Sequence, residues 1–483
     1  MKLIYALAFL SLFNPLGALA QQAPWGRADV PISARDRVYA ADQTSNTVSV
    51  IDPSSNTLLG VVRLGDPVPG ALSPLYRGQL LVHGLGYSPD GKTLAVVSIA
   101  SNSVTLIDTA TNRIKGIVYV GRSPHEAFFT TDGAELWVTV RGEDYVSVID
   151  PVAQKEIRRI QLPNGPGMTI FSTDGRYGFI CSSFTPEMDV VDTKSHAVLA
   201  RLSQASPFCP NIAVSPENDE VWLTLKDVGR TQVFSAKPPF AQIALLETGP
   251  ITNHVNFANN RNGKFAYITI GGANEVKAFR RVSGAPPELV ATIPVGELPH
   301  GIWPSGDGSR VYVAYENGGM AAAIDTISNK VITTIPIGQT SQALVYVPNA
   351  VPDGGGTQNL TAQGESANSA RLHLAPASAG LPNAYASATV NSLGLLDLVE
   401  VAASGLARNT PYELYLAEAP TAPFGKLQPL AILRSNKDGA GIAQAIGPLK
   451  TVAANATAAS GPRRYLIVTE LTDASQVVLR PQL

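Results

Sequence analysis

Alternating hydrophobic and polar residues recur along the middle of the chain at a nearly constant interval. The repeated unit is a short apolar run that ends in Asp, found at residues 48–52, 104–108, 146–150, 188–192 and 321–325. Degenerate copies occupy residues 231–235 and 276–280. After an insertion that follows the first copy, the spacing is about 42 to 46 residues, which is the period of a four-stranded propeller blade.

Each period contains four strand-like segments. In one unit these are residues 127–130, 136–140, 146–149 and 156–161, with Asp132-Gly133 between the first two. Asp followed by Gly favours a tight hairpin turn, because Gly readily adopts a positive φ. The Asp residues that end the third strands, such as Asp108 and Asp325, are interpreted as turn residues that accept backbone hydrogen bonds.

The number of first strands predicts the number of blades. Seven are expected, at residues 81–88, 125–130, 167–172, 211–215, 254–258, 300–304 and 342–347. The chain enters the repeats at Arg37 with a second-strand pattern, and the first strand missing from that blade comes only at 342–347. We therefore predict an all-β fold, a seven-bladed propeller over residues 37–350 that is closed by its N- and C-terminal strands.

The composition changes after Pro348. Residues 351–366 contain Gly354-Gly355-Gly356 among Asn, Thr and Gln, which predicts a flexible linker. Short strand-like runs with turn signals follow, so residues 367–483 are predicted to form a small β-sandwich accessory domain. This segment has no Cys, no Met and a single histidine, His373, which excludes a copper centre of the cupredoxin type.

The first residues have the pattern of a secretory signal peptide. Lys2 precedes an apolar run at residues 3–13, and Ala18-Leu19-Ala20 is a small-x-small cleavage site. Residues 1–20 are therefore expected to be removed near Ala20, and residues 21–36 to lead into the propeller. This predicts a periplasmic or secreted protein, and no later apolar run has the length of a membrane helix.

Composition narrows the possible partners. The 36 Lys and Arg residues are balanced by 38 Asp and Glu, which gives a net charge of -2. Because phosphate-backbone binding needs a broad positive field, nucleic acid is disfavoured as a partner. The expected partner is a protein or a small molecule, and the protein is expected to be a monomer.

The two cysteines, Cys181 and Cys209, predict one disulfide. Cys181 ends a second strand and Cys209 lies in the connection to the next blade's first strand, so both are expected on the same face. An exported protein reaches an oxidising compartment, which favours the bridge over two isolated thiols.

Four of the six histidines share one repeat position. His83, His125, His254 and His300 each lie near the start of an innermost strand, so they are expected to ring one mouth of the central channel. Gln342 occupies the same position between the blades of His300 and His83, and Gly167 and Pro210 leave a gap on the other side.

Three interpretations of this ring remain open. The imidazoles can bind a transition metal such as copper, or a haem. They can instead line a metal-free polar pocket for a ligand, or serve only as a repeated structural cap. Loops after the second strands are expected to bring Arg141, Tyr315 and other polar residues to the rim, and the insertion at residues 66–79 contributes Tyr76 and Arg77 as ligand contacts.

One segment resembles a known family. Residues 299–314, Pro-His-Gly-Ile-Trp-Pro-Ser-Gly-Asp-Gly-Ser-Arg-Val-Tyr-Val-Ala, and the run at 323–338 are similar to the YVTN-type repeat of exported seven-bladed propellers. The resemblance covers about residues 37–350 and implies the fold. It does not select a function, since related propellers include binding proteins, surface-layer proteins, nitrous-oxide reductase and haem-d1 propellers, and lactonases or lyases.

The functional hypothesis follows from the histidine ring. The chain contains no HExxH, GxSxG or phosphate-loop motif, so no catalytic residue is assigned. We expect an exported propeller that binds a ligand or protein partner at the histidine-lined mouth. The alternatives are a metal- or haem-dependent redox, lyase or lactonase-type enzyme at the same site, and a structural protein of the cell envelope or surface.

Overall fold

The computed structural model describes residues 31–65, 80–282, 285–363, 369–377, 379–392, 397–447 and 463–482. The predicted signal peptide, and Tyr76 and Arg77 in the insertion, lie outside the described residues. The chain divides into two compact units, one containing the repeats and the other the C-terminal strands. In the described part of the chain, no helix is both long enough and apolar enough to cross a membrane.

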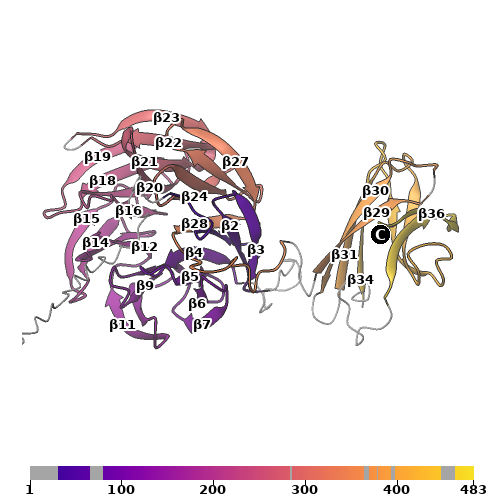
Figure 1. Cartoon of the computed structure of the whole chain (residues 1–483), viewed down its shortest axis with the longest axis horizontal. Helices are drawn as coiled ribbons and strands as arrows, with labels where there is room; N and C mark the ends of the chain where they lie inside the picture. The colour runs from indigo at the N-terminus through magenta and orange to yellow at the C-terminus, as the bar shows by residue number, and fades with distance from the viewer. Residues whose placement is uncertain are drawn as a thin grey trace, which may run out of the picture. The chain divides into compact units, whose positions relative to one another are not determined.

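The repeats form seven four-stranded antiparallel sheets, which confirms the predicted seven-bladed propeller (Figure 1). The first blade consists of β28 (Ser341–Val347), β1 (Arg37–Asp42), β2 (Thr47–Asp52) and β3 (Thr57–Arg63). The second consists of β4 (Val82–Tyr87), β5 (Thr93–Ser98), β6 (Ser103–Asp108) and β7 (Ile114–Tyr119). The third consists of β8 (Pro124–Phe129), β9 (Leu136–Val140), β10 (Tyr145–Asp150) and β11 (Lys155–Gln161). The next two are β12 (Pro166–Phe171), β13 (Tyr177–Ser182), β14 (Glu187–Asp192) and β15 (Val198–Ser203); and β16 (Ile212–Val214), β17 (Glu220–Leu225), β18 (Arg230–Ser235) and β19 (Gln242–Glu247). The last two are β20 (Thr252–Asn260), β21 (Gly263–Ile270), β22 (Glu275–Arg280) and β23 (Glu288–Pro294), with the short 3₁₀ helix η1 (Gly271–Ala273) before β22; and β24 (Pro299–Pro304), β25 (Arg310–Tyr315), β26 (Met320–Asp325) and β27 (Lys330–Pro336).

The first blade is built from both ends of the repeat region. Strand β1 pairs with β2 on one side and with β28 on the other, in a register that places Arg37 opposite Val347 and Ala41 opposite Ala343. This is the closure predicted from the order of strand patterns. It leaves no open sheet edge between the first and last blades.

The burial of the strands follows their place in the blade. Inner strands such as β4, β8 and β24 are buried along their whole length, whereas outer strands such as β15 alternate between partly buried and exposed positions. Figure 1 shows the inner strands gathered at the middle of the propeller. Residues placed on an inner strand therefore face the central channel or the neighbouring blade.

Aromatic side chains on second strands hold neighbouring blades together. Trp137 on β9 contacts Phe171 of the next blade edge to face, with ring centroids 5.1 Å apart. Trp222 on β17 contacts Phe257 of its neighbour in the same way at 5.8 Å. Both tryptophans are fully buried, so the propeller core is a ring of interfaces between sheets.

The Asp residues that end third strands are turn residues, as their repeat position suggested. Asp108 accepts the backbone N–H of Thr111 at 2.9 Å, and Asp325 accepts that of Ser328 at 2.7 Å. Their carboxylates thus satisfy the hairpin that follows each third strand.

Residues 351–360 lie on the propeller, although their composition is that of a flexible linker. The guanidinium of Arg37 donates to the carbonyl of Gly355 at 2.7 Å, and the amide of Asn112 donates to that of Gly356 at 2.9 Å. Gly356 has a φ of +59°, and a Cβ there would come within 2.4 Å of Val351. This segment therefore packs against the first two blades.

The C-terminal unit is all-β, and its predicted sandwich takes the form of one sheet that curls nearly into a barrel. Its eight strands run in the spatial order β33-β32-β35-β36-β29-β30-β31-β34, and the edge strands β33 and β34 lie close to each other. The strands are β29 (Ser369–Pro376), β30 (Tyr385–Ser392), β31 (Asp397–Ser404), β32 (Pro411–Ala417), β33 (Gln428–Arg434), β34 (Gly441–Gly447), β35 (Tyr465–Glu470) and β36 (Asp473–Pro481). They enclose a separate apolar core.

Candidate functional site

The four repeated histidines lie near the starts of inner strands, as their shared repeat position predicts. His83 is on β4, His125 on β8, His254 on β20 and His300 on β24, and each is at most 7% exposed. They form two pairs from adjacent blades. The ring centroids of His83 and His125 are 4.4 Å apart, and those of His254 and His300 are 4.5 Å apart.

The hydrogen bonds of the first pair fix its tautomers. The Nδ1 of His125 lies 2.9 Å from the carbonyl oxygen of Gly167 and must donate to it. A neutral His125 then has its lone pair on Nε2, which lies 2.9 Å from the Nε2 of His83. His83 therefore donates from Nε2, and its Nδ1 accepts from the side-chain amide of Gln43 at 3.2 Å.

The second pair is held in a related way. The Nδ1 of His300 donates to the backbone carbonyl of Gln342 at 2.6 Å, which leaves its Nε2 with a lone pair. Gly167 and Gln342 stand at the histidine's own repeat position in the next blade, 42 residues along the chain in each case. The same hydrogen bond, from the histidine Nδ1 to a backbone carbonyl of the next blade, thus orients both His125 and His300.

Burial keeps these imidazoles neutral. It lowers the pKa of His83 and of His254 to about 3, because the charged ring would lose its hydration. Burial also lowers the pKa of His125 and of His300 well below the usual value, and nearby positive charge and the other rings of the cluster lower both further. The mouth therefore offers neutral donors and acceptors at physiological pH.

Two cations come close to the ring from the loops after second strands. Arg141 lies over the faces of Phe184 and Phe208, with its guanidinium carbon 5.6 and 5.7 Å from the ring centroids. Burial lowers the pKa of both Arg141 and Lys226. Neither forms an ion pair with any residue in the described ranges.

One carboxylate offsets part of this positive charge. Glu316 raises the pKa of Lys226, and its Oε2 is buried with no hydrogen-bond partner among the described residues. Arg141 and Lys226 nevertheless both lower the pKa of His83, and Lys226 also lowers that of His254 and His300, so their positive charges act on the ring.

Glu126 is the functional candidate that the sequence analysis missed. It lies on β8 directly after His125 and is 3% exposed. Burial raises the pKa of its carboxyl well above the usual value, with only the backbone N–H of Leu85 favouring the ionised form. A Cβ on Gly84 would come within 2.3 Å of the backbone oxygen of His125 and 2.5 Å of Oε2 of Glu126, so the neighbouring blade must have glycine there.

Comparison of the repeats distinguishes Glu126 from the residues at the same position in other blades. The positions that follow His83, His254 and His300 are Gly84, Val255 and Gly301. A glutamate on a fully buried inner strand is therefore an exception to the pattern, and such exceptions mark functional candidates.

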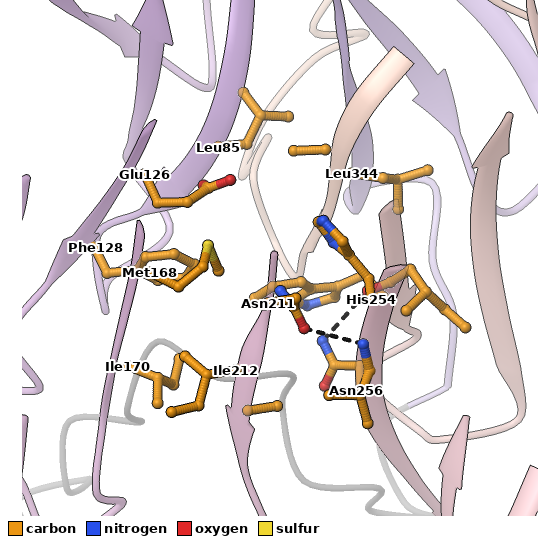
Figure 2. Close-up of a pocket in the computed structure, with 15 residues that line it drawn as sticks. Leu85, Glu126, Phe128, Met168, Ile170, Asn211, Ile212, His254, Asn256 and Leu344 are labelled. Atoms are coloured by element: carbon orange, nitrogen blue, oxygen red, sulfur yellow. Dashed lines mark hydrogen bonds between the residues drawn. The ribbon is translucent and has the colours of Figure 1, made fainter. Parts of the chain in front are cut away.

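A small cavity between the inner strands adjoins the ring at His254. A cavity of about 30 Å³ is lined by inner strands of the propeller, including Leu85, Met168 and Leu344. Figure 2 shows Glu126 and Met168 on one side of this cavity and His254 and Leu344 on the other. This volume holds one or two water molecules, so a ligand larger than water has to bind at the mouth.

A groove lies beside the mouth. It has a volume of about 740 Å³ and is lined by Phe208, Lys226, Asp227, Val228, Gly229, Glu247, Gly249, Pro250, Ile251 and Lys277. Phe208 also contacts Arg141, and Lys226 also acts on the histidines. The groove thus adjoins the two cations that act on the histidine ring.

The other predicted site residues have different positions. Gln342 contributes its backbone carbonyl to the ring. Tyr315 is 4% exposed and belongs to an apolar core cluster, and a Cβ on Gly296 would come within 2.3 Å of its ring. Its side chain is therefore packed inside the propeller. His196, outside the ring, pairs with Glu135 at 2.9 Å.

A disulfide braces the side of the ring that lacks histidines. Cys181 at the end of β13 is bonded to Cys209, just before β16, with Cα atoms 6.0 Å apart. Both cysteines are fully buried. The bridge joins the two blades that carry Gly167 and Pro210 at the histidine position.

Comparisons with known proteins support the fold alone. No family model matches the chain, and no curated protein matches it in sequence. Among solved structures, it is similar to Kuenenia stuttgartiensis hydrazine synthase, with a TM-score of 0.51 and 17% identity over 59% of this chain and 94% of that one. It is also similar to a functionally unknown protein from Desulfotomaculum acetoxidans, with a TM-score of 0.54 and 12% identity over 64% of this chain and 98% of that one.

Proposed function

We propose that the chain is an exported propeller of the YVTN-repeat type that binds a small organic anion at the histidine-lined mouth. The observation that carries this proposal is the placement of Arg141 and Lys226. Both are partly buried, both act on the histidines, and neither has an ion-pair partner in the described ranges. Partly buried cations of this kind gain the most from a charge-assisted hydrogen bond to an anion.

The two cations that act on the ring favour an anion over a cation in the centre of the mouth. Arg141 and Lys226 lower the pKa of His83, and Lys226 lowers that of His254 and His300. The same positive charges attract a carboxylate or phosphate. The Nε2 lone pair of His300 can accept a hydrogen bond from a hydroxyl of the ligand. The ring of His254, which has no hydrogen-bond partner among the described residues, can donate to an oxygen of the anion.

The groove indicates the size of the ligand. Its volume of about 740 Å³ is within the range of small-molecule sites. Phe208, Val228 and Ile251 give it apolar walls, and Lys226 stands between it and the ring. A ligand with an anionic group at the mouth and an apolar body in the groove matches both parts.

Calorimetric titration of the mature chain with benzoate and phenyl phosphate tests this proposal. Lys226→Met and Arg141→Met should each weaken binding about tenfold or more, because a charged hydrogen bond is lost. Lys92→Met is the matched control, since Lys92 is a propeller lysine whose side chain is 75% exposed. Failure of both probes to bind, or equal affinity for the wild type and the two mouth variants, would contradict the proposal.

A further inference from the structure

Three buried metal-ligating groups converge beside the mouth, independently of the anion site. The nitrogens of His83 and His125 and a carboxylate oxygen of Glu126 all lie within 4.8 Å of one another. The groups come from adjacent inner strands, β4 and β8, which the propeller core holds rigidly. They combine two imidazoles with one carboxylate, a donor set that suits late first-row divalent metals.

The hydrogen bonds around His125 match those of a metal-ligating imidazole. Such a ring usually donates its second N–H to a backbone carbonyl or carboxylate, which orients it and raises its basicity. The Nδ1 of His125 donates to the carbonyl of Gly167 in this way, so its Nε2 carries the lone pair, which accepts from His83 in this structure and would coordinate a metal.

Gln43 allows His83 to present a metal-coordinating lone pair on its Nε2 as well. Its amide faces the Nδ1 of His83 at 3.2 Å. Because an amide presents NH₂ on one side and oxygen on the other, a half-turn of Gln43 lets its oxygen accept an N–H from Nδ1. His83 then carries its proton on Nδ1, and its Nε2 becomes a second lone pair directed at the same point as that of His125.

The spacing requires only a small adjustment. The two Nε2 atoms are 2.9 Å apart. Two ligands that are each about 2.0 Å from one tetrahedral ion lie about 3.3 Å apart. Rotations of the two rings that separate the nitrogens by a few tenths of an ångström are therefore enough.

We propose that His83, His125 and Glu126 form a mononuclear site for Cu²⁺ or Zn²⁺, with Gln43 as the positioning residue for His83. Three protein ligands leave a fourth position for water or a ligand. Arg141 and Lys226 oppose a cation at this place, and Glu126, whose carboxyl loses its proton when it binds the metal, supplies the compensating negative charge. The site differs from a four-histidine ring, because His254 and His300 are not among its ligands.

Titration of the metal-free mature chain with Cu²⁺, followed by electron paramagnetic resonance, tests this assignment. We expect one Cu²⁺ per chain with hyperfine splitting from two nitrogens. His83→Ala and His125→Ala should abolish stoichiometric binding, whereas His254→Ala and His300→Ala should retain it. Gln43→Ala should weaken binding about 10- to 100-fold, as for other partners of metal ligands.

The Glu126→Gln variant separates a loss of metal binding from a loss of the fold. The amide has the shape of the carboxyl and fits against Gly84, so the fold should persist while Cu²⁺ affinity falls on the order of 100-fold. His196→Ala, in a turn outside the ring, is the control for non-specific histidine binding. The proposal is overturned if the folded wild type binds no stoichiometric Cu²⁺, if Glu126→Gln binds it unchanged, or if the spectrum shows four nitrogens that are lost with His254.

Discussion

The phenolic hydroxyl of Tyr346 on the last propeller strand donates a 2.5 Å hydrogen bond to the carboxylate of Asp36, 310 residues earlier in the chain. Asp36 also accepts the backbone N–H groups of Ser33 and Asn349. One buried carboxylate thus joins the segment before β1 to the closing strand β28 and to the residues just after it.

Tyr346→Phe should destabilise the propeller by about 1–3 kcal/mol, because Asp36 is left with one acceptor position unfilled in a buried place. Urea unfolding measures the change. Tyr119→Phe, the same chemical change at a tyrosine that is 72% exposed, should have almost no effect. Equal stability of the Tyr346 and Tyr119 variants would mean that the closure bond contributes nothing.

Truncation after Leu360 should leave the propeller folded, whereas truncation after Gln339 should unfold it. The shorter chain lacks β28 and exposes the whole edge of β1, while the longer one keeps the contacts of residues 351–360 with Asn112 and Arg37. Thermal unfolding followed by circular dichroism compares the two. A cooperative transition in the shorter chain at the temperature of the longer one would refute the closure.

Replacing both Cys181 and Cys209 by Ala should lower the free energy of unfolding by about 3–4 kcal/mol in the chain-entropy model, for a closed loop of 28 residues. Because both sulfurs are buried, dithiothreitol should reduce the native protein slowly and the unfolded protein quickly. Thiol titration with and without urea measures this difference. Rapid titration of two thiols in the native, unreduced protein would exclude the bridge.

Acid should destabilise the propeller through its histidines. The folded pKa of His254 is about 3, below the unfolded value near 6.5, so this contribution is complete above pH 6.5 and is lost as the pH falls toward 3. Between pH 7.5 and pH 5 it amounts to about 2 kcal/mol for this one residue.

A variant isolates that contribution. Asp42, whose pKa burial raises to about 7, changes stability in the opposite direction over the same range. His254→Gln keeps Asp42 and should therefore lose about 2 kcal/mol less stability than the wild type between pH 7.5 and pH 5. Urea midpoints at the two pH values give the comparison, and parallel losses in both proteins would argue against a neutral buried His254.

The repeat period was sufficient to predict the propeller because each blade repeats the same burial pattern. Inner strands, Asp-Gly turns and the late return of β28 all have local sequence signals. The C-terminal domain lacks such a constraint. Alternation of apolar and polar residues is the same in a sandwich and in a curled sheet, and only the pairing of β29 with β36, far apart in the sequence, distinguishes them.

The sequence predicted the positions of the candidate residues only in outline. Repeat alignment placed the four histidines and Gln342 correctly around the channel, but tautomers depend on contacts between blades, such as that of His125 with Gly167. Tyr315 was expected at the rim because its loop reaches that face, yet its ring turns into the core beside Gly296. The orientation of one side chain at the end of a strand depends on packing that periodicity does not describe.

Closure of the first blade by β28 also means that β1 is synthesised long before its partner strand. At about 5–20 residues per second, a ribosome needs roughly 15–60 s to add the 310 residues between Arg37 and its partner Val347. During that interval β1 has only one of its two neighbours, and its free edge is open to pairing with other nascent chains. We therefore expect the yield of folded protein to depend strongly on whatever shields β1 until the last propeller strand is made.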